Sequence, residues 1–222
     1  MEHYPVKNVD GGIRIEGFPD AVKLLKLDDP KAQRISDLLL HRSDLEFAAS
    51  CLEAINTTPA DLHTVREALW RCAIIHFAKC FGNSAARFRL SREKVYIGER
   101  LAALQAFEYF KHLRNKHIVH DENSYAQSIS GAVLNRGDKP YKIEKILCFA
   151  AHGNTLEQGN YNNLKLLIDK ALAWVVNEFD TCCEVVSKEL EAIPYEELLA
   201  RPDVQYHVPS VEEISGNRKE KP

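Results

Sequence analysis

The chain has 222 residues, of which 45% are hydrophobic and 27% charged, and its formal net charge at pH 7 is −3. This length is enough for one domain with a sizeable core. The slightly acidic balance argues against a protein that coats nucleic acid over its whole surface. No apolar run approaches the roughly 20 residues that span a bilayer, and no basic stretch followed by an apolar one marks the N-terminus. We therefore expect neither a membrane segment nor a secretory signal, and the six cysteines, without a CxxC pair, fit a cytoplasmic protein.

The first part of the chain is predicted to form a lead-in and two long helices. Residues 1–28 read as an irregular lead-in, with a short strand at GIRIEG and a turn of helix at PDAVKLL. A helix over about 29–55 is predicted because aspartate caps free N–H groups and proline suits the first helical position. A second helix is predicted over 58–82, opened by a threonine followed by proline and closed by a glycine.

The second part is predicted to contain two more long helices and a hairpin. A basic connector, NSAARFRLSREK, leads to a helix that runs from about Glu99 into the sequence HIVHDEN. The stretches QSISGAVLN and YKIEKILCFA surround the turn RGDKP and predict a β-hairpin insertion around 127–150. The last long helix is expected from about Asn160 to Glu191, and the polar tail at 202–222 is expected to be loose.

Together these elements predict a mainly all-α fold. Long amphipathic helices joined by short connections are typical of an antiparallel helical bundle, here over residues 29–201 with the small hairpin inserted.

The stretch FKHLRNKHIVHDEN, residues 110–123, gathers three histidines, two lysines and an arginine at a helix end. At 100° per residue, Arg114 shares the apolar stripe of two phenylalanines from the preceding turns. An arginine is rare on such a stripe unless it is paired or lies in a functional cleft. His117 continues the stripe, and the helix is expected to end near 118–121, which lets His120 turn toward Arg114.

Other interpretations of these letters stay open. An arginine paired with a carboxylate, a histidine at a helix C-terminus and a solvated basic face would explain them without a function. A metal site from His112, His117, His120 and Asp121 is disfavoured, because the first two diverge by about 140° on a helix. The established two-histidine helical site needs i, i+4 spacing with a glutamate. We therefore expect no metal and no cofactor.

Residues Arg114 to His120 read RNKHIVH, with five residues between the arginine and the histidine and a polar residue directly after the arginine. This pattern resembles the Arg-x4–6-His motif of the HEPN superfamily. The wording LRNKHIVHDEN is similar to that of HEPN-like proteins of abortive-infection and toxin–antitoxin type. The resemblance extends loosely over residues 30–190. Val119 stands where that style usually has alanine, and the predicted hairpin is an elaboration of the minimal bundle.

The resemblance implies a metal-independent endoribonuclease, a hydrolase whose active site forms where two motifs meet in a homodimer. His120 would act as general acid or base, and Arg114 would hold the scissile phosphate and stabilise the charged transition state. Asn115 would orient the phosphate or the histidine, while Lys116 and His117 would add positive field. RNA supplies its own nucleophile, the 2′-OH, so this chemistry needs no metal.

The basic connector is expected near the same cleft. Arg87, Arg89 and Arg92, interspersed with a phenylalanine, would contact single-stranded RNA, although a solvated connector is the alternative. Single-stranded RNA is the implied substrate, and an antitoxin protein is an implied partner. Two other functions stay open: a non-cleaving HEPN-like module that binds RNA, nucleotide or protein, and a helical scaffold without a ligand.

Overall fold

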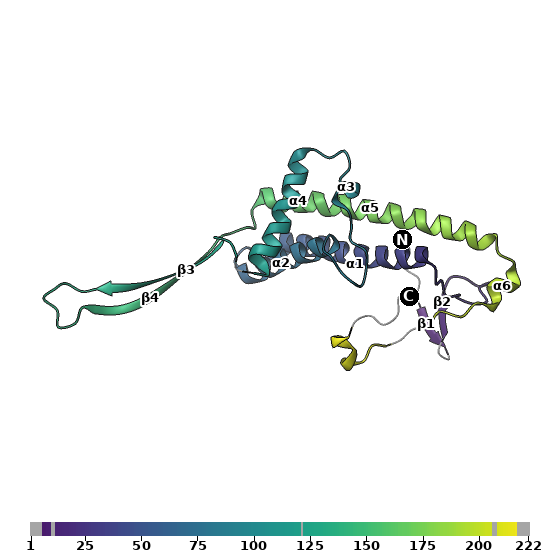
Figure 1. Ribbon diagram of the computed structural model, residues 1–222, viewed down its shortest axis with the longest axis horizontal. Helices are drawn as coiled ribbons and strands as arrows, with labels where there is room; N and C mark the ends of the chain where they lie inside the picture. Colours follow the sequence, from purple (N-terminus) through teal and green to yellow (C-terminus); the bar gives the residue numbers. More distant parts are fainter. Residues whose placement is uncertain (1–5, 10–11, 121, 206–207, 217–222) are drawn as a thin grey trace.

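The computed structural model describes residues 6–9, 12–120, 122–205 and 208–216. Figure 1 shows an elongated molecule, in which a helical body carries a two-stranded arm that projects from one end. Helices dominate the described residues, so the predicted mainly all-α fold with a small hairpin is confirmed. Among these residues, no helix combines the length and apolar character that crossing a bilayer requires.

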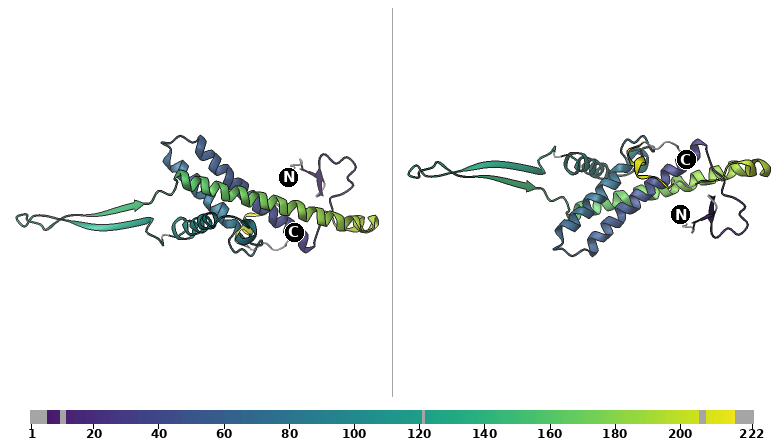
Figure 2. Two further views of the ribbon diagram at one scale, coloured as in Figure 1. Left: turned by 90° about the horizontal axis from the view of Figure 1, so that it is seen from above. Right: turned by 90° about the horizontal axis from the view of Figure 1, so that it is seen from below.

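Two long helices, α1 (Pro30–Thr57) and α5 (Gln158–Glu191), run side by side along the body (Figures 1 and 2). An ion pair between Lys31 and Glu189 joins the start of α1 to the end of α5, so the pair is antiparallel. The cap predicted for α1 is confirmed, because the Asp29 carboxylate accepts hydrogen bonds from two backbone N–H groups of the first turn, at 2.7 and 2.8 Å. Shorter elements complete the body: α2 (His63–Cys80), α3 (Arg92–Val95), α4 (Leu101–Leu113), the π-helical turn η1 (Arg114–Ile118), α6 (Tyr195–Ala200) and the 3-10 helix η2 (Val211–Ser215).

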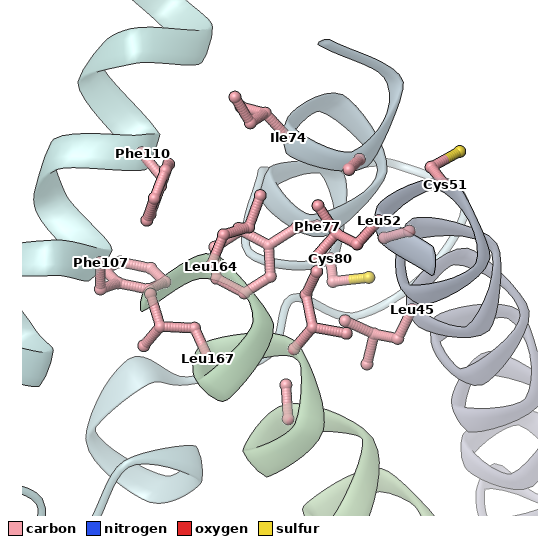
Figure 3. Packing of buried hydrophobic residues seen from close by; sticks show 14 of the residues in the cluster. Leu45, Cys51, Leu52, Ile74, Phe77, Cys80, Phe107, Phe110, Leu164 and Leu167 are labelled. Atoms are coloured by element: carbon pink, nitrogen blue, oxygen red, sulfur yellow. The ribbon is translucent and has the colours of Figure 1, made fainter. Parts of the chain in front are cut away.

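The core lies where α1, α2, α4 and α5 meet (Figure 3). Phe77 of α2 packs against Phe107 of α4, with ring centroids 6.0 Å apart. Trp70 meets Phe110 edge-on at 5.9 Å, and its indole N–H donates to the Thr155 hydroxyl at 2.9 Å. Full burial of each large apolar side chain contributes roughly 1.5–3 kcal/mol. This packing fixes the last turns of α4, from which the arginine–histidine motif continues.

The predicted start of the second helix at Thr58 is wrong, because α2 begins at His63. The Thr58 hydroxyl donates to the Ala54 carbonyl at 2.7 Å, so this residue closes α1 instead of capping α2. The Arg66 guanidinium, from the first turn of α2, donates to the carbonyls of Ile55 and Thr58 at 2.5 and 3.0 Å. These bonds satisfy carbonyls that the end of a helix leaves free, and they hold the two helices together.

The lead-in contains an antiparallel pair of short strands, β1 (Val6–Val9) and β2 (Gly12–Ile15). The strand predicted at GIRIEG is therefore confirmed. The helical turn predicted at PDAVKLL is wrong, since that stretch pairs with the segment after α6 instead. The N–H of Val204 donates to the carbonyl of Leu24 in this stretch at 2.9 Å, and the N–H of Lys26, directly after it, donates to the carbonyl of Pro202 at 2.8 Å.

The tail predicted to be loose thus begins with an ordered pairing at Pro202 to Val204. Further along, the tail forms η2, where Ser210 and Glu213 make a reciprocal capping box. Residues 206–207 and 217–222 of the predicted tail lie outside the described residues.

The predicted hairpin insertion is confirmed as β3 (Ala126–Leu134) and β4 (Ile143–His152). These antiparallel strands form the arm, which extends away from the helices in both views of Figure 2. Ile129 lies opposite Phe149, and the two side chains are 61% and 62% exposed. Apolar side chains on the arm therefore face solvent, and the site described below lies on the helical body.

Candidate functional site

The arginine–histidine motif lies on η1, a π-helical turn that continues α4. The N–H of Val119 donates to the carbonyl of Arg114 at 3.0 Å, which is an i to i+5 hydrogen bond. Such turns occur mostly as single turns within α-helices and are frequent at functional sites. The helix ends at Ile118, as predicted. The bond returns the backbone at Val119 to that of Arg114, and His120 follows directly after the turn.

Arg114 is half-buried, and within the described residues its guanidinium makes one hydrogen bond. Its Nη1 donates to the amide oxygen of Asn115 at 2.8 Å. Within the described part of the chain, Arg114 forms no ion pair with a carboxylate, unlike the neighbouring Arg87 and Arg92. A guanidinium with five donors and no carboxylate partner is suited to hold an anion such as phosphate.

Arg114 and Asn115 line a pocket of about 350 Å³ between α2, the connector after it and α4. This volume lies at the lower end of the range for small-ligand sites. Cations beside aromatic rings are the combination that proteins use to bind single-stranded nucleic acid. The lining residues fall into four cations (Lys79, Arg87, Lys111, Arg114), three aromatic residues (Phe77, Phe81, Phe107) and a set of small or uncharged polar residues (Ala78, Gly82, Asn83, Ser84, Asn115), with no carboxylate.

The remaining motif residues lie outside the pocket walls. His117 is buried, as its place on the apolar stripe predicts, and its ring lies 5.7 Å from that of Tyr125. Lys116 is exposed and forms an ion pair with Glu122. His120 is exposed after the turn. The structure therefore places Arg114 and Asn115 in one pocket. His120, five residues after Asn115 in the sequence, is exposed on the surface.

Of the three connector arginines predicted to contact RNA, Arg87 alone lines the pocket. Its guanidinium is paired with the Asp44 carboxylate, with 2.5 Å between Nη2 and Oδ2. Arg89 is exposed and lies outside the walls. Arg92 forms an ion pair with Glu108 of α4. Arg92 is therefore paired with a carboxylate and lies outside the pocket walls.

A row of buried polar residues on α1 holds the connector in place. Asp37, His41 and Asp44 follow one another at i, i+4 and i+7, which places them on one face of the helix. The backbone N–H of Phe88 donates to Asp37 Oδ2 at 3.0 Å, and its carbonyl accepts from His41 Nε2 at 2.8 Å. Asp44 pairs with Arg87. The sequence does carry a signal for this row, because polar residues recur with the helical period beside buried leucines.

The same row sets the charges behind the pocket. Burial by itself would raise the pKa of Asp44, but hydrogen bonds from Arg87, Lys79 and His76 outweigh it and lower that pKa below its ordinary value. Burial, with the nearby positive charge of Arg87, lowers the pKa of His41 to about 4. At neutral pH the carboxylate is therefore charged and His41 neutral, which leaves Arg87 locked against α1.

Within the described ranges, no group of three histidine, cysteine, aspartate or glutamate side chains is placed to hold a metal ion. Asp121, a member of the disfavoured metal alternative, lies outside those ranges. Sequence reasoning missed the other charged and polar pocket residues, which are Lys79, Asn83, Ser84 and Lys111, and it missed the aromatic wall around Phe81. Chemically, the pocket can bind phosphate and a flat aromatic ligand. No protein-family model matches the chain, and neither the search of curated proteins nor that of solved structures gave a match.

Proposed function

We propose that this protein is a metal-independent endoribonuclease of HEPN type that binds single-stranded RNA at the pocket of Arg114. The supporting observation is that half-buried Arg114 has no carboxylate partner in the described residues. The three further cations of its pocket are already paired, Lys79 and Arg87 with Asp44 and Lys111 with Glu108. A half-buried guanidinium without a carboxylate partner is costly unless an anion joins it. A phosphodiester is such an anion, and the aromatic walls suit the base attached to it.

The proposed reaction uses groups of the RNA and of the motif. The 2′-oxygen attacks the adjacent phosphorus and loses its proton, while the bond from phosphorus to the 5′-oxygen breaks and that oxygen gains a proton. The products are a 2′,3′-cyclic phosphate and a 5′-hydroxyl. Arg114 stabilises the charge on the phosphoryl oxygens, and Asn115 fixes the guanidinium through its amide oxygen. His120 takes or gives one of the two protons.

A homodimer would complete this site. Two proton transfers call for two groups, and one chain offers a single His120 at the motif. In a two-fold dimer the same surface meets itself, so two exposed His120 side chains would face one cleft. Exposed Val119, beside the histidine, gives this surface an apolar contact. We propose that the dimer acts in the cytoplasm as a toxin or phage-defence component and that an antitoxin protein restrains it.

A second candidate is a non-cleaving module that binds RNA or nucleotide. The position of His120 outside the pocket walls favours it, because binding needs only Arg114 and its neighbours. The two candidates separate on whether RNA is cut.

The test is incubation of the purified protein with single-stranded RNA in EDTA. We expect the natural protein to cut the RNA and Arg114→Ala to cut it about 10²–10³-fold more slowly. Removal of one hydrogen-bond donor to the charge that develops in a transition state has an effect of this size. Arg136→Ala is the matched control, because Arg136 is an exposed arginine near the tip of the arm. Binding without cleavage would support the second candidate. If the protein neither binds nor cuts RNA, a helical scaffold without a ligand is the remaining interpretation.

A further inference from the structure

The pocket contains one aromatic ring that is partly open. Phe77 and Phe107 are only 1% and 4% exposed, whereas Phe81 is half-buried. The ring of Phe81 is stacked on buried Tyr96, with centroids 5.9 Å apart and planes 22° from parallel. Phe107 meets Phe81 edge-on at 4.9 Å. Phe77 also contacts Phe81, with ring centroids 5.3 Å apart. Three buried rings therefore hold Phe81, which still lines the pocket.

The two asparagines of the pocket are oriented as hydrogen-bond donors. The amide oxygen of Asn83 accepts from Arg89 Nη1 at 3.3 Å, and that of Asn115 accepts from Arg114 Nη1 at 2.8 Å. Within the described residues, neither amide nitrogen makes a hydrogen bond. The cations of the pocket are donors as well. The side chains at the pocket walls therefore offer many donors, and each amide oxygen already accepts one of the two hydrogen bonds that it can accept.

We propose that the pocket holds one unpaired base of the RNA strand, stacked on Phe81, and that it selects guanine. This inference rests on the proposed function, whose substrate it specifies. Guanine presents two adjacent acceptors, N7 and O6, whereas adenine and cytosine present an amino donor beside their acceptor. An amino donor on the edge that meets these donors is left unpaired, which weakens binding about tenfold or more. Guanine carries its own donors on its other edge, away from N7 and O6.

The dimensions and charges of the pocket fit this ligand. The volume of about 350 Å³ suits one small ligand, so the base must leave its stack to enter. Lys111 and Arg114 line the same pocket and provide contacts for the phosphates on either side of the base. Single-stranded RNA is recognised in this way, by splayed bases on aromatic rings. A base-paired guanine, held in its helix, would be excluded.

The test uses short strands of 2′-O-methyluridine with one central position varied, because a blocked 2′-oxygen prevents cleavage and leaves binding alone. We expect guanine at that position to bind about tenfold more tightly than adenine, cytosine or an abasic sugar. Phe81→Ala should weaken binding of the guanine strand about tenfold and leave that of the abasic strand unchanged, and Phe81→Tyr should retain it. Phe149→Ala, which changes an exposed ring on the arm, is the control.

Asn83→Ala should bring the ratio of the affinities for the guanine and adenine strands toward one. The affinity for the abasic strand should be unchanged. Equal affinity for the guanine and abasic strands would overturn the base-pocket inference while leaving the proposed nuclease intact, because cleavage is measured separately on unmodified RNA. Guanine-selective binding by a protein that never cuts RNA would sustain the inference and overturn the nuclease. The strands with different bases are compared on the natural protein, so this part of the test does not depend on whether a protein variant folds.

Discussion

The guanidinium of Arg87 and the carboxylate of Asp44 form an ion pair, 2.5 Å from Nη2 to Oδ2, in which the two side chains are only 7% and 9% exposed. The pair ties the connector to α1 and thereby places Arg87 at the pocket wall. Two charges buried this far depend on each other, because either one alone would lie in a poorly solvated place. The stability of the body and the shape of the pocket are therefore linked at this contact.

Asp44→Ala should lower the free energy of unfolding by about 3–5 kcal/mol, because it leaves the buried charge of Arg87 without a partner. Urea denaturation followed by circular dichroism measures this. Asp169→Ala is the matched control, since Asp169 pairs with Lys165 on the surface of α5, and loss of an exposed pair costs about 1 kcal/mol or less. Equal effects of the two substitutions would show that the buried pair has no special weight.

The stability of the protein should fall between pH 6.5 and pH 4 because of His41. Its folded pKa of about 4 lies below the ordinary value of 6.5, so the unfolded chain takes up the proton first as the pH falls. Neutral His41 therefore contributes to the free energy of unfolding in full above pH 6.5, and this contribution is lost as the pH falls toward 4. Its size is on the order of 3 kcal/mol. Urea titrations at pH 7, 5.5 and 4.5 should show a shallower loss in His41→Gln. The exposed His112→Gln is the control, and an unchanged pH slope in His41→Gln would contradict this assignment.

Much of the fold could be predicted because the long helices carry local signals. The Asp29-Pro30 start of α1 is a capping signal that works within one turn, and the apolar period of α5 repeats over its whole length. The start of α2 was misplaced because Thr58 can serve either helix, and its hydroxyl bonds α1. The sequence carries no local signal for the π-helical turn, in which buried His117 meets the ring of Tyr125 from outside the turn.

The pocket was predictable only in part. Arg114 stands out because a cation on an apolar stripe is rare, and Arg87 belongs to a visibly basic connector. Lys79, Asn83 and Lys111 come from α2, the connector and α4, and each looks like an ordinary surface residue in its own stretch. Only the packing of the three elements brings them together, which a single-element pattern does not express.

Gly153→Ala should disturb the motif from the base of the arm. A Cβ atom at Gly153 would lie 2.6 Å from Cδ1 of Tyr125, whose ring packs on His117. Displacing that ring should cost about 1–3 kcal/mol and raise amide hydrogen exchange in η1. Gly131→Ala, on β3 with no atom within 4 Å of the added Cβ, should leave exchange in η1 unchanged. Similar exchange in the two variants would mean that Tyr125 does not support the turn.

The arm should be dispensable for the helical body. The hydrogen bonds and ion pairs that the structure shows for residues 128–150 stay within the arm. Replacing these residues by Asn-Gly, a pair that favours a tight hairpin turn, should keep the melting temperature within a few degrees, since about 1 kcal/mol moves it by roughly 2–4 °C. A loss of helical circular dichroism at 25 °C would show that the arm is needed for the body to fold.

The central claim is tested most directly by cleavage of unmodified single-stranded RNA in EDTA, with the natural protein beside His120→Ala. We expect the natural protein to leave 2′,3′-cyclic phosphate ends and His120→Ala to be about 10²–10⁴-fold slower. The circular dichroism of His120→Ala should be unchanged, since the side chain is exposed. Its molar mass in solution is measured as well, because His120 lies at the surface proposed for the dimer. Cleavage that requires magnesium, or that persists at full rate in His120→Ala, would contradict the account.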